Sequence, residues 1–243
     1  MGVPSGVNGP ILTHRSVLLK RLIDFAVEPG AEFAIEMLPP DYSLGEEWSS
    51  LSRSAQDSEN GIILISALIP PLGFRPRLAL LPPFPITELS KSNSFDDMRE
   101  FVSRRHTIAM ILLRLGHWAI AIAEDGKLVV TKTGSRFVKN QHRKGGQSSN
   151  RFRRGREEWI RELFDQAGEA ASTRFREYEG HLEYLVLGGD RVVLGRFLKR
   201  VELPDGLGVR VLPNRIDVGQ PGRKALDHAV HDAWSYRAFE FGD

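Results

Sequence analysis

HTIAMILLRLGHWAIAIAEDGKLVVTKT, residues 106–133, contains three short apolar runs separated by turn signals. The first run ends at Gly116, and the second, residues 117–124, alternates in the way of a half-buried strand. Asp125-Gly126 then favours a two-residue hairpin turn, after which the third run begins. We therefore predict three sequential antiparallel strands that form a meander.

The chain after these strands alternates between predicted helices and strands. A long helix spans about residues 150–175, because its apolar side chains recur at spacings of three, four and seven. The order β-β-β-α-β-α-β-α is that of the ribonuclease-H-like fold, an α/β fold with a mixed sheet, and we assign it to residues 104–243. Its remaining predicted elements are a strand at 182–188, a helix near 190–199, a strand at 208–213 and a helix near 222–238.

Residues 1–103 predict a separate α+β domain. A helix at 16–27 has apolar residues at helical spacing and stops at Pro29-Gly30. Ser94 is the expected N-cap of a later helix, because acidic residues follow it in the first turn. The other predicted elements are strands at 32–38, 61–69 and 76–81 and this second helix at 94–105.

Charge is unevenly distributed along the 243 residues. The net charge is only +2, but residues 132–161 hold ten Lys or Arg against two Glu, a local net of +8. The rest of the chain therefore sums to −6. A basic block on an otherwise acidic protein indicates one surface that faces a polyanion.

Other features of the sequence exclude cysteine-dependent chemistry and argue against a signal peptide or a membrane span. Cysteine is absent, which excludes disulfides, thiol catalysis and zinc held by cysteine. The N-terminus lacks a basic segment followed by an apolar one, so we expect no signal peptide. The longest apolar run is broken by Pro70 and Pro71 and is too short to span a bilayer. We expect a cytoplasmic protein without membrane contact.

The basic block surrounds a neutral, glycine-containing loop, HRKGGQSSNRFRR at 142–154. Gly145 and Gly146 allow a backbone close to a ligand, and Gln147 can orient water and donate hydrogen bonds to developing negative charge. A plain flexible turn between solvated charges is the alternative. The side chains expected to contact RNA are Lys139, Arg143, Lys144, Ser148, Arg151, Arg153, Arg154 and Arg156.

The longer stretch HRKGGQSSNRFRRGREE, residues 142–158, resembles the central motif of the class I release factors of eukaryotes and archaea. The resemblance covers about residues 104–240 and implies that Gly145, Gly146 and Gln147 are catalytic. The loop would enter the peptidyl transferase centre of the large ribosomal subunit and promote hydrolysis of peptidyl-tRNA. The implied partners are ribosomal RNA and peptidyl-tRNA, without DNA, metal or cofactor, and the protein would act as a monomer.

Two motifs that read stop codons in that family, Asn-Ile-Lys-Ser and Tyr-x-Cys, do not occur in this sequence. The chain is therefore most similar to the stand-alone bacterial VLRF-type factors. These factors release nascent chains from stalled ribosomes or from large subunits that have already been split from the small subunit. The role of residues 1–103 would then be docking on the ribosome. Two alternatives stay open, an endonuclease that cuts tRNA near its CCA end and a non-catalytic module that binds ribosomal RNA or tRNA.

Three weaker signals favour simpler explanations. His228 and His231 have metal-binding spacing, but no further ligands accompany them, so a surface helix accounts for them. The glycines of LGGDR, at 187–191, could approach a phosphate but more simply make a turn. The predicted strands within 106–133 carry apolar core positions, which disfavours a two-metal nuclease.

Overall fold

The computed structural model describes residues 9–242 apart from 29, 93, 138–146 and 202–208, and only the backbone of 54 and 147–152. The chain forms two compact units. The first comprises Met1–Arg104 with Trp234–Asp243, and the second comprises Arg105–Ala233. Within the described residues, no helix is both long and apolar enough to cross a membrane.

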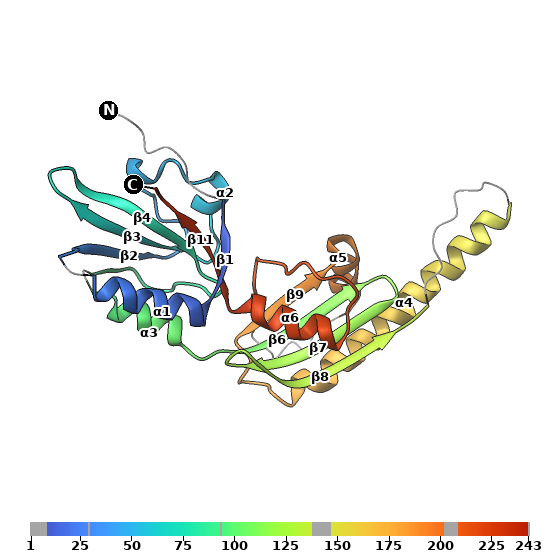
Figure 1. Ribbon diagram of the computed structural model, residues 1–243. Helices are drawn as coiled ribbons and strands as arrows, with labels where there is room; N and C mark the ends of the chain where they lie inside the picture. The colour runs from blue at the N-terminus through green and yellow to red at the C-terminus, as the bar shows by residue number, and fades with distance from the viewer. Residues whose placement is uncertain (1–8, 29, 93, 138–146, 202–208, 243) are drawn as a thin grey trace. The chain divides into compact units, whose positions relative to one another are not determined.

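The second unit has the predicted ribonuclease-H-like topology (Figure 1). Its five-stranded sheet has the order β10-β9-β6-β7-β8; the meander β6-β7-β8 is antiparallel, and β9 runs parallel to both β6 and β10. The elements follow the predicted order β-β-β-α-β-α-β-α. They are β6 (Thr107–Arg114), β7 (His117–Glu124), β8 (Lys127–Ser135), α4 (Gln147–Arg176), β9 (Tyr184–Gly189), α5 (Arg191–Arg200), β10 (Arg210–Val211) and α6 (Arg223–Ala233).

The turn between β7 and β8 explains why the sequence favoured a hairpin here. Asp125 has φ 49° and Gly126 has φ 80°. Positive φ at both central residues is the condition of a type I′ turn, whose twist matches the flanking strands. The predicted Asp-Gly hairpin is therefore confirmed.

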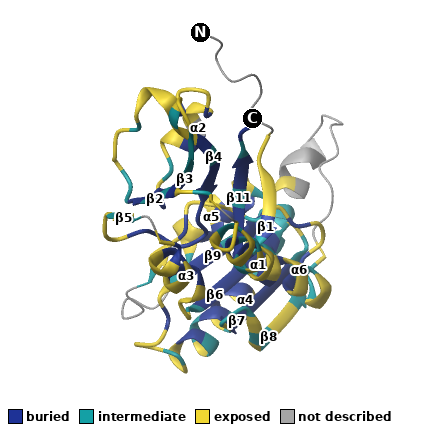
Figure 2. Cartoon of the chain, turned by 60° about the vertical axis from the view of Figure 1, so that its left-hand side comes forward, coloured by how far each residue is buried: buried dark blue, intermediate teal, exposed yellow. Residues whose placement is uncertain are grey.

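The core of the second unit lies between the sheet and helices α4 and α5, while α6 lies against β7 and β8 on the other face (Figure 1). The central strands β6 and β7 are buried along most of their length, whereas the edge strand β8 is largely exposed (Figure 2). Burial of apolar side chains on both faces of β6 and β7 makes these two strands the centre of the unit. The helix residues buried in this core are Ile160, Leu163, Phe164, Ala167, Ala171, Phe175, Val193, Leu194 and Phe197.

The first unit is an antiparallel six-stranded sheet of order β1-β11-β4-β3-β2-β5 with cores on both faces. Helices α1 (Arg15–Ala26) and α3 (Asp96–Ser103) contribute to one core. The 3-10 helix η1 (Glu46–Trp48) and α2 (Arg53–Gln56) contribute to the other. The strands are β1 (Ile11–His14), β2 (Phe33–Leu38), β3 (Ile62–Ile69), β4 (Gly73–Leu81), β5 (Ser90–Ser92) and β11 (Ser235–Glu240).

The prediction of a helix through residue 238 was wrong. Helix α6 ends at Ala233, and strand β11 starts at Ser235 and pairs with β1 and β4 of the first unit. Tyr236 faces one core of that sheet and Phe239 faces the other, the alternation of a strand buried on both faces. Residues 234–243 therefore lie in the first unit, so the units differ from the division expected at 103/104.

The start of α3 also differs from the prediction. Its N-cap residue is Phe95, and the helix begins at Asp96. Ser94 still satisfies the first turn, because its hydroxyl oxygen accepts a hydrogen bond from the Asp96 N–H at 3.1 Å. The short strands β1 and β5 were not predicted, since their partners are distant in sequence.

Candidate nucleic-acid interface

Helix α4 carries its basic first turns well beyond the core of the second unit. Among residues 153–176, the first buried side chain is Ile160. The helix begins at Gln147, so about 20 Å of helix precedes the core at 1.5 Å per residue. Figure 1 shows these turns extending past the strands of the sheet. The sequence predicted this helix but placed its start near residue 150.

The residues expected to form the site fall into three groups. Arg153 and Arg154 are exposed on α4, and Arg156 is half-buried there. Gln147, Ser148 and Arg151 lie in the first two turns of α4, where only the backbone is described. Outside the described residues lie Lys139, Arg143, Lys144, Gly145 and Gly146.

Gln147 is the first residue of α4. The first four N–H groups of a helix have no carbonyl partner within it, and they carry the positive end of the helix dipole. The backbone N–H of Gln147 therefore belongs to a turn whose donors suit an oxygen that bears negative charge.

The chain that leaves β8 is attached to α4 before it enters residues 138–146. The ring of Phe137 lies 6.0 Å from that of Trp159, measured between centroids. The guanidinium of Arg136 pairs with the carboxylate of Glu162 on the same helix. Trp159 lies about 18 Å along the helix from Gln147. These contacts attach the end of β8 to α4. Phe137 was not predicted as part of the site, although an aromatic residue ahead of a glycine-containing loop is a usable signal.

Two acidic residues that follow the basic start of α4, Glu157 and Asp165, are paired with arginines of α5. Arg196 of α5 binds Glu157, and Arg200 binds Asp165 through two hydrogen bonds of 2.9 Å. The hydrogen bond to Asp165 raises the pKa of Arg200. The acids of this surface are therefore partly neutralised by pairing inside the unit.

The exposed arginines at the start of α4 keep their charge uncompensated. Arg153 and Arg154 make no ion pair with any residue whose side chain the structure describes, while Arg156 lies 4.0 Å from Glu157. Guanidinium groups in this state bind phosphate through charge and paired hydrogen bonds. The start of α4 can thus contact a nucleic-acid backbone.

The LGGDR segment serves the fold. Asp190 is the N-cap of α5, and its carboxylate accepts the N–H of Val193 at 2.9 Å. Gly189 has φ 108°, and a Cβ there would lie 2.3 Å from the carbonyl oxygen of Leu113. The glycines therefore permit a turn and a close backbone approach, and Asp190 already occupies the start of the helix.

The histidines of α6 are surface residues, and Nδ1 of His231 lies 3.6 Å from a carboxylate oxygen of Asp232. His228 and His231 are exposed, and the neighbouring Asp227 pairs with Arg223 at 3.3 Å. Among the side chains that the structure describes, no three His, Asp or Glu residues are grouped to hold a metal ion. The inner positions of β6 and β7 are apolar and buried, so these two strands present no buried carboxylate to a metal ion.

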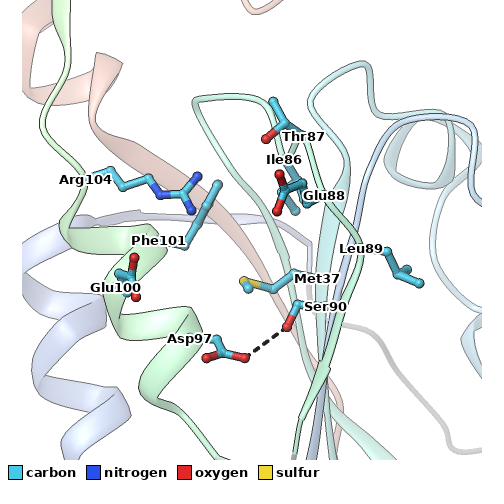
Figure 3. Close-up of a pocket in the computed structure, with 10 residues that line it drawn as sticks. All are labelled: Met37, Ile86, Thr87, Glu88, Leu89, Ser90, Asp97, Glu100, Phe101 and Arg104. Carbon is cyan, nitrogen blue, oxygen red and sulfur yellow. Dashed lines mark hydrogen bonds between the residues drawn. The ribbon is translucent and has the colours of Figure 1, made fainter.

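A cavity of about 300 Å³ lies in the first unit between β5 and α3 (Figure 3). Met37, Ile86 and Phe101 form its buried apolar part. Ser90 donates a hydrogen bond to Asp97 at 3.1 Å across it. Its charged lining consists of Glu88, Asp97, Glu100 and Arg104, a net −2 that disfavours phosphate. Nucleic acid is therefore expected at α4 and not here.

The second unit, with its ribonuclease-H-like topology and its projecting basic helix, matches the sequence model of a family of release factors. That model describes the VLRF1 release factor of Actinobacteria and Chloroflexi and matches residues 106–238, more than half of the chain. The protein therefore belongs to the class of translational release factors. Within that class, the chain belongs to the VLRF1 family.

Relatives with curated names are release factors as well. Peptide chain release factor subunit 1 of Archaeoglobus fulgidus is 26% identical over 189 residues, which are 75% of this chain and 46% of that protein. The protein of the same name from Aeropyrum pernix is 27% identical over 140 residues, 57% of this chain and 38% of that one. The chain therefore spans less than half the length of these relatives.

Solved structures with detectable likeness include the archaeal translation termination factor aRF1. It has a TM-score of 0.43 and 20% identity, covering 90% of this chain and 69% of its own. Pelota of Archaeoglobus fulgidus has a TM-score of 0.30 and 16% identity, covering 94% and 66%. The strand order of the second unit itself defines its fold.

Proposed function

We propose that this protein releases nascent chains from stalled ribosomes or split large subunits by hydrolysing peptidyl-tRNA. In this proposal, Gly145, Gly146 and Gln147 enter the peptidyl transferase centre of the large subunit. The observation that carries the proposal is the family match over 106–238, a range that contains these residues together with β8 and α4 on either side.

The build of α4 supports this function. The first residue of α4 lies about 20 Å along the helix from the point where the helix enters the core. This projecting part can reach into a narrow space while the rest of the unit stays outside. Arg153 and Arg154 are exposed close to its tip, where the walls of a ribosomal cavity would be phosphate. The contact of Phe137 with Trp159 holds the other end of the loop against the same helix.

Each residue of the triplet has a chemical reason to be there. Glycine at 145 and 146 allows a close backbone approach that a side chain would block. The N–H of Gln147 would donate to the oxygen that gains negative charge, and its carboxamide would hold the attacking water. Ribosomal RNA and the tRNA ribose would supply the remaining contacts. The cytoplasm would be the place of action.

The bond changes are those of ester hydrolysis. The water oxygen bonds to the carbonyl carbon that joins the peptide to the tRNA 3′ end. The bond from that carbon to the ribose oxygen breaks, and a proton from the water passes to that oxygen. The products are a free peptide and a tRNA with an intact CCA end, which distinguishes this reaction from cleavage of the tRNA.

The test uses large subunits that carry radiolabelled peptidyl-tRNA. Wild type should release peptide with an intact CCA end. Gln147→Ala keeps the backbone N–H but loses the carboxamide that would hold the attacking water, so the rate should fall about 10²-fold, the cost of a misplaced reactant. Gln166→Ala, an exposed glutamine on the same helix, is the matched control and should act like wild type.

Other results would replace the proposal. A shortened tRNA would indicate an endonuclease in a release-factor fold. Binding without release by wild type would indicate a non-catalytic RNA-binding module. Equal release by wild type and Gln147→Ala would remove the glutamine side chain from the mechanism.

A further inference from the structure

The ion pairs of Glu157 with Arg196 and of Asp165 with Arg200 join helices α4 and α5. The charged surface along these two helices is called the seam, and it comprises Arg154, Glu157, Arg161, Asp165, Arg196, Lys199 and Arg200. The two helices lie side by side beneath it. The rings of Phe164 and Phe197 are 5.7 Å apart and nearly perpendicular. Further along, Gly168 of α4 closely approaches Val201 after α5. Because α4 and α5 are closely packed against each other, the charged side chains of the seam project from two helices whose relative position is fixed.

The seam has more positive than negative charge. Its two carboxylates, Glu157 and Asp165, are each paired across the helices with an arginine of α5. Five cations stand against these two acids and the exposed Glu158, which lies one helical turn from Arg154 and from Arg161, so the net charge is +2. Pairing also holds Arg196 and Arg200 at the surface, because each is tied to α4 while about two fifths of its side chain stays exposed.

Three cations of the seam are available to a partner. Arg154, Arg161 and Lys199 are exposed and form no ion pair with the side chains that the structure describes. Arg154 and Arg161 lie seven residues apart, which places them on one face of α4 about 10 Å apart. Lys199 follows Arg196 by one helical turn on the adjoining surface of α5. The cations thus continue from the projecting part of α4 onto the body of the unit.

We infer that the α4–α5 seam binds the phosphate backbone of ribosomal RNA, with Arg154, Arg161 and Lys199 as the contacting residues. The inference rests on the proposed function for its partner and extends the contact from the start of α4 to α5. Cations on a surface without a shape-specific pocket bind the phosphates of RNA and do not recognise its base sequence. The seam would therefore position the protein on RNA, while Gln147 acts on the ester.

The seam is tested by the salt dependence of binding to large ribosomal subunits. The variant Arg161→Gln/Lys199→Gln loses two phosphate contacts. The fall of log affinity with log salt concentration should therefore become shallower, its slope smaller in magnitude by about 1.5. Near 0.1 M salt, affinity should fall about tenfold or more. Lys199→Gln alone should lower the slope by about half as much, and because this side chain is exposed, its effect does not depend on a change in folding.

The matched control is Lys127→Gln/Lys224→Gln, which removes the same charge from exposed positions on β8 and α6. An unchanged slope in this control with a reduced slope in the seam variant supports the seam. Equal slopes in the two double variants would overturn it and indicate a general charge effect. Unchanged binding by the seam variant would also overturn it.

The seam and the proposed function can fail separately. If Gln147→Ala loses peptide release while the seam variant binds like wild type, the function stands and the seam is wrong. If wild type binds large subunits with a seam-dependent slope but releases no peptide, the seam stands and hydrolysis is wrong.

Discussion

The close packing of α4 against the end of α5 makes a specific prediction at Gly168. A Cβ at this position would lie 2.6 Å from Cγ1 and 3.0 Å from Cγ2 of Val201. Both distances are too short for carbon atoms in contact. Gly195 of α5 is also inside a helix, but a Cβ there would meet nothing within 4 Å. The two glycines therefore separate the effect of packing from that of helix propensity.

The expected changes in the free energy of unfolding have opposite signs. Replacing a helical glycine by alanine stabilises by about 1 kcal/mol, because the unfolded chain loses conformational freedom. Gly195→Ala should show this gain. Gly168→Ala should receive the same gain but lose about 1–3 kcal/mol to overpacking against the stiff side chain of Val201. We expect a net loss of about 1 kcal/mol.

Urea unfolding of the full chain, followed by circular dichroism, measures both changes. For a unit of this size, 1 kcal/mol corresponds to about 3–5 °C in the melting temperature, so a thermal scan provides a second measurement. Val201→Ala should reduce the cost of Gly168→Ala in a double-mutant cycle, since it removes both methyl groups that collide. If Gly168→Ala were as stabilising as Gly195→Ala, the packing described for α4 and α5 would be wrong.

Three further predictions concern other parts of the chain. Burial raises the pKa of the Tyr236 phenol, so the free energy of unfolding is unaffected by this group below about pH 10 and falls above it by up to about 1.4 kcal/mol per pH unit. Tyr236→Phe should flatten this decline in urea unfolding between pH 8 and 11, and parallel stability curves for the variant and wild type would contradict it. Gly134→Ala should destabilise by about 1–3 kcal/mol, because its Cβ would lie 2.3 Å from the Trp118 ring, and an unchanged melting temperature would refute this contact. Phe137→Ala should leave stability within about 0.5 kcal/mol, since the ring is 75% exposed, but should change the fluorescence of Trp159; an equal change in a Trp159→Phe background would argue against the ring contact.

The sequence predicted the second unit well because local signals agree with its fold. Alternation in β7, the Asp-Gly turn and the helical spacing of α4 each indicate the observed element on their own. Strand β11 is different. Its residues fit a helical pattern continued from α6, and only pairing with β1 and β4, more than a hundred residues earlier in the chain, makes it a strand.

The candidate site divides in the same way. The loop and its arginines could be identified from sequence, because the residues that carry the motif are contiguous. The seam could not, since Arg196 reaches Glu157 and Arg200 reaches Asp165 only when α5 packs beside α4. Phe137 lay next to the motif, but its role depends on the position of Trp159 across the loop. The assignments of Gly145, Gly146 and Gln147 stay predictions until the release assay is done.

The placement of β11 has a consequence for the order in which the protein can be assembled. The first unit needs β11 between β1 and β4, yet β11 is translated after the entire second unit. The second unit is one continuous segment, so it can fold while the first still exposes two unpaired strand edges, a state that invites aggregation. This chain would thus complete its first unit last, and stopping its synthesis before Ser235 would leave the sheet of that unit without β11.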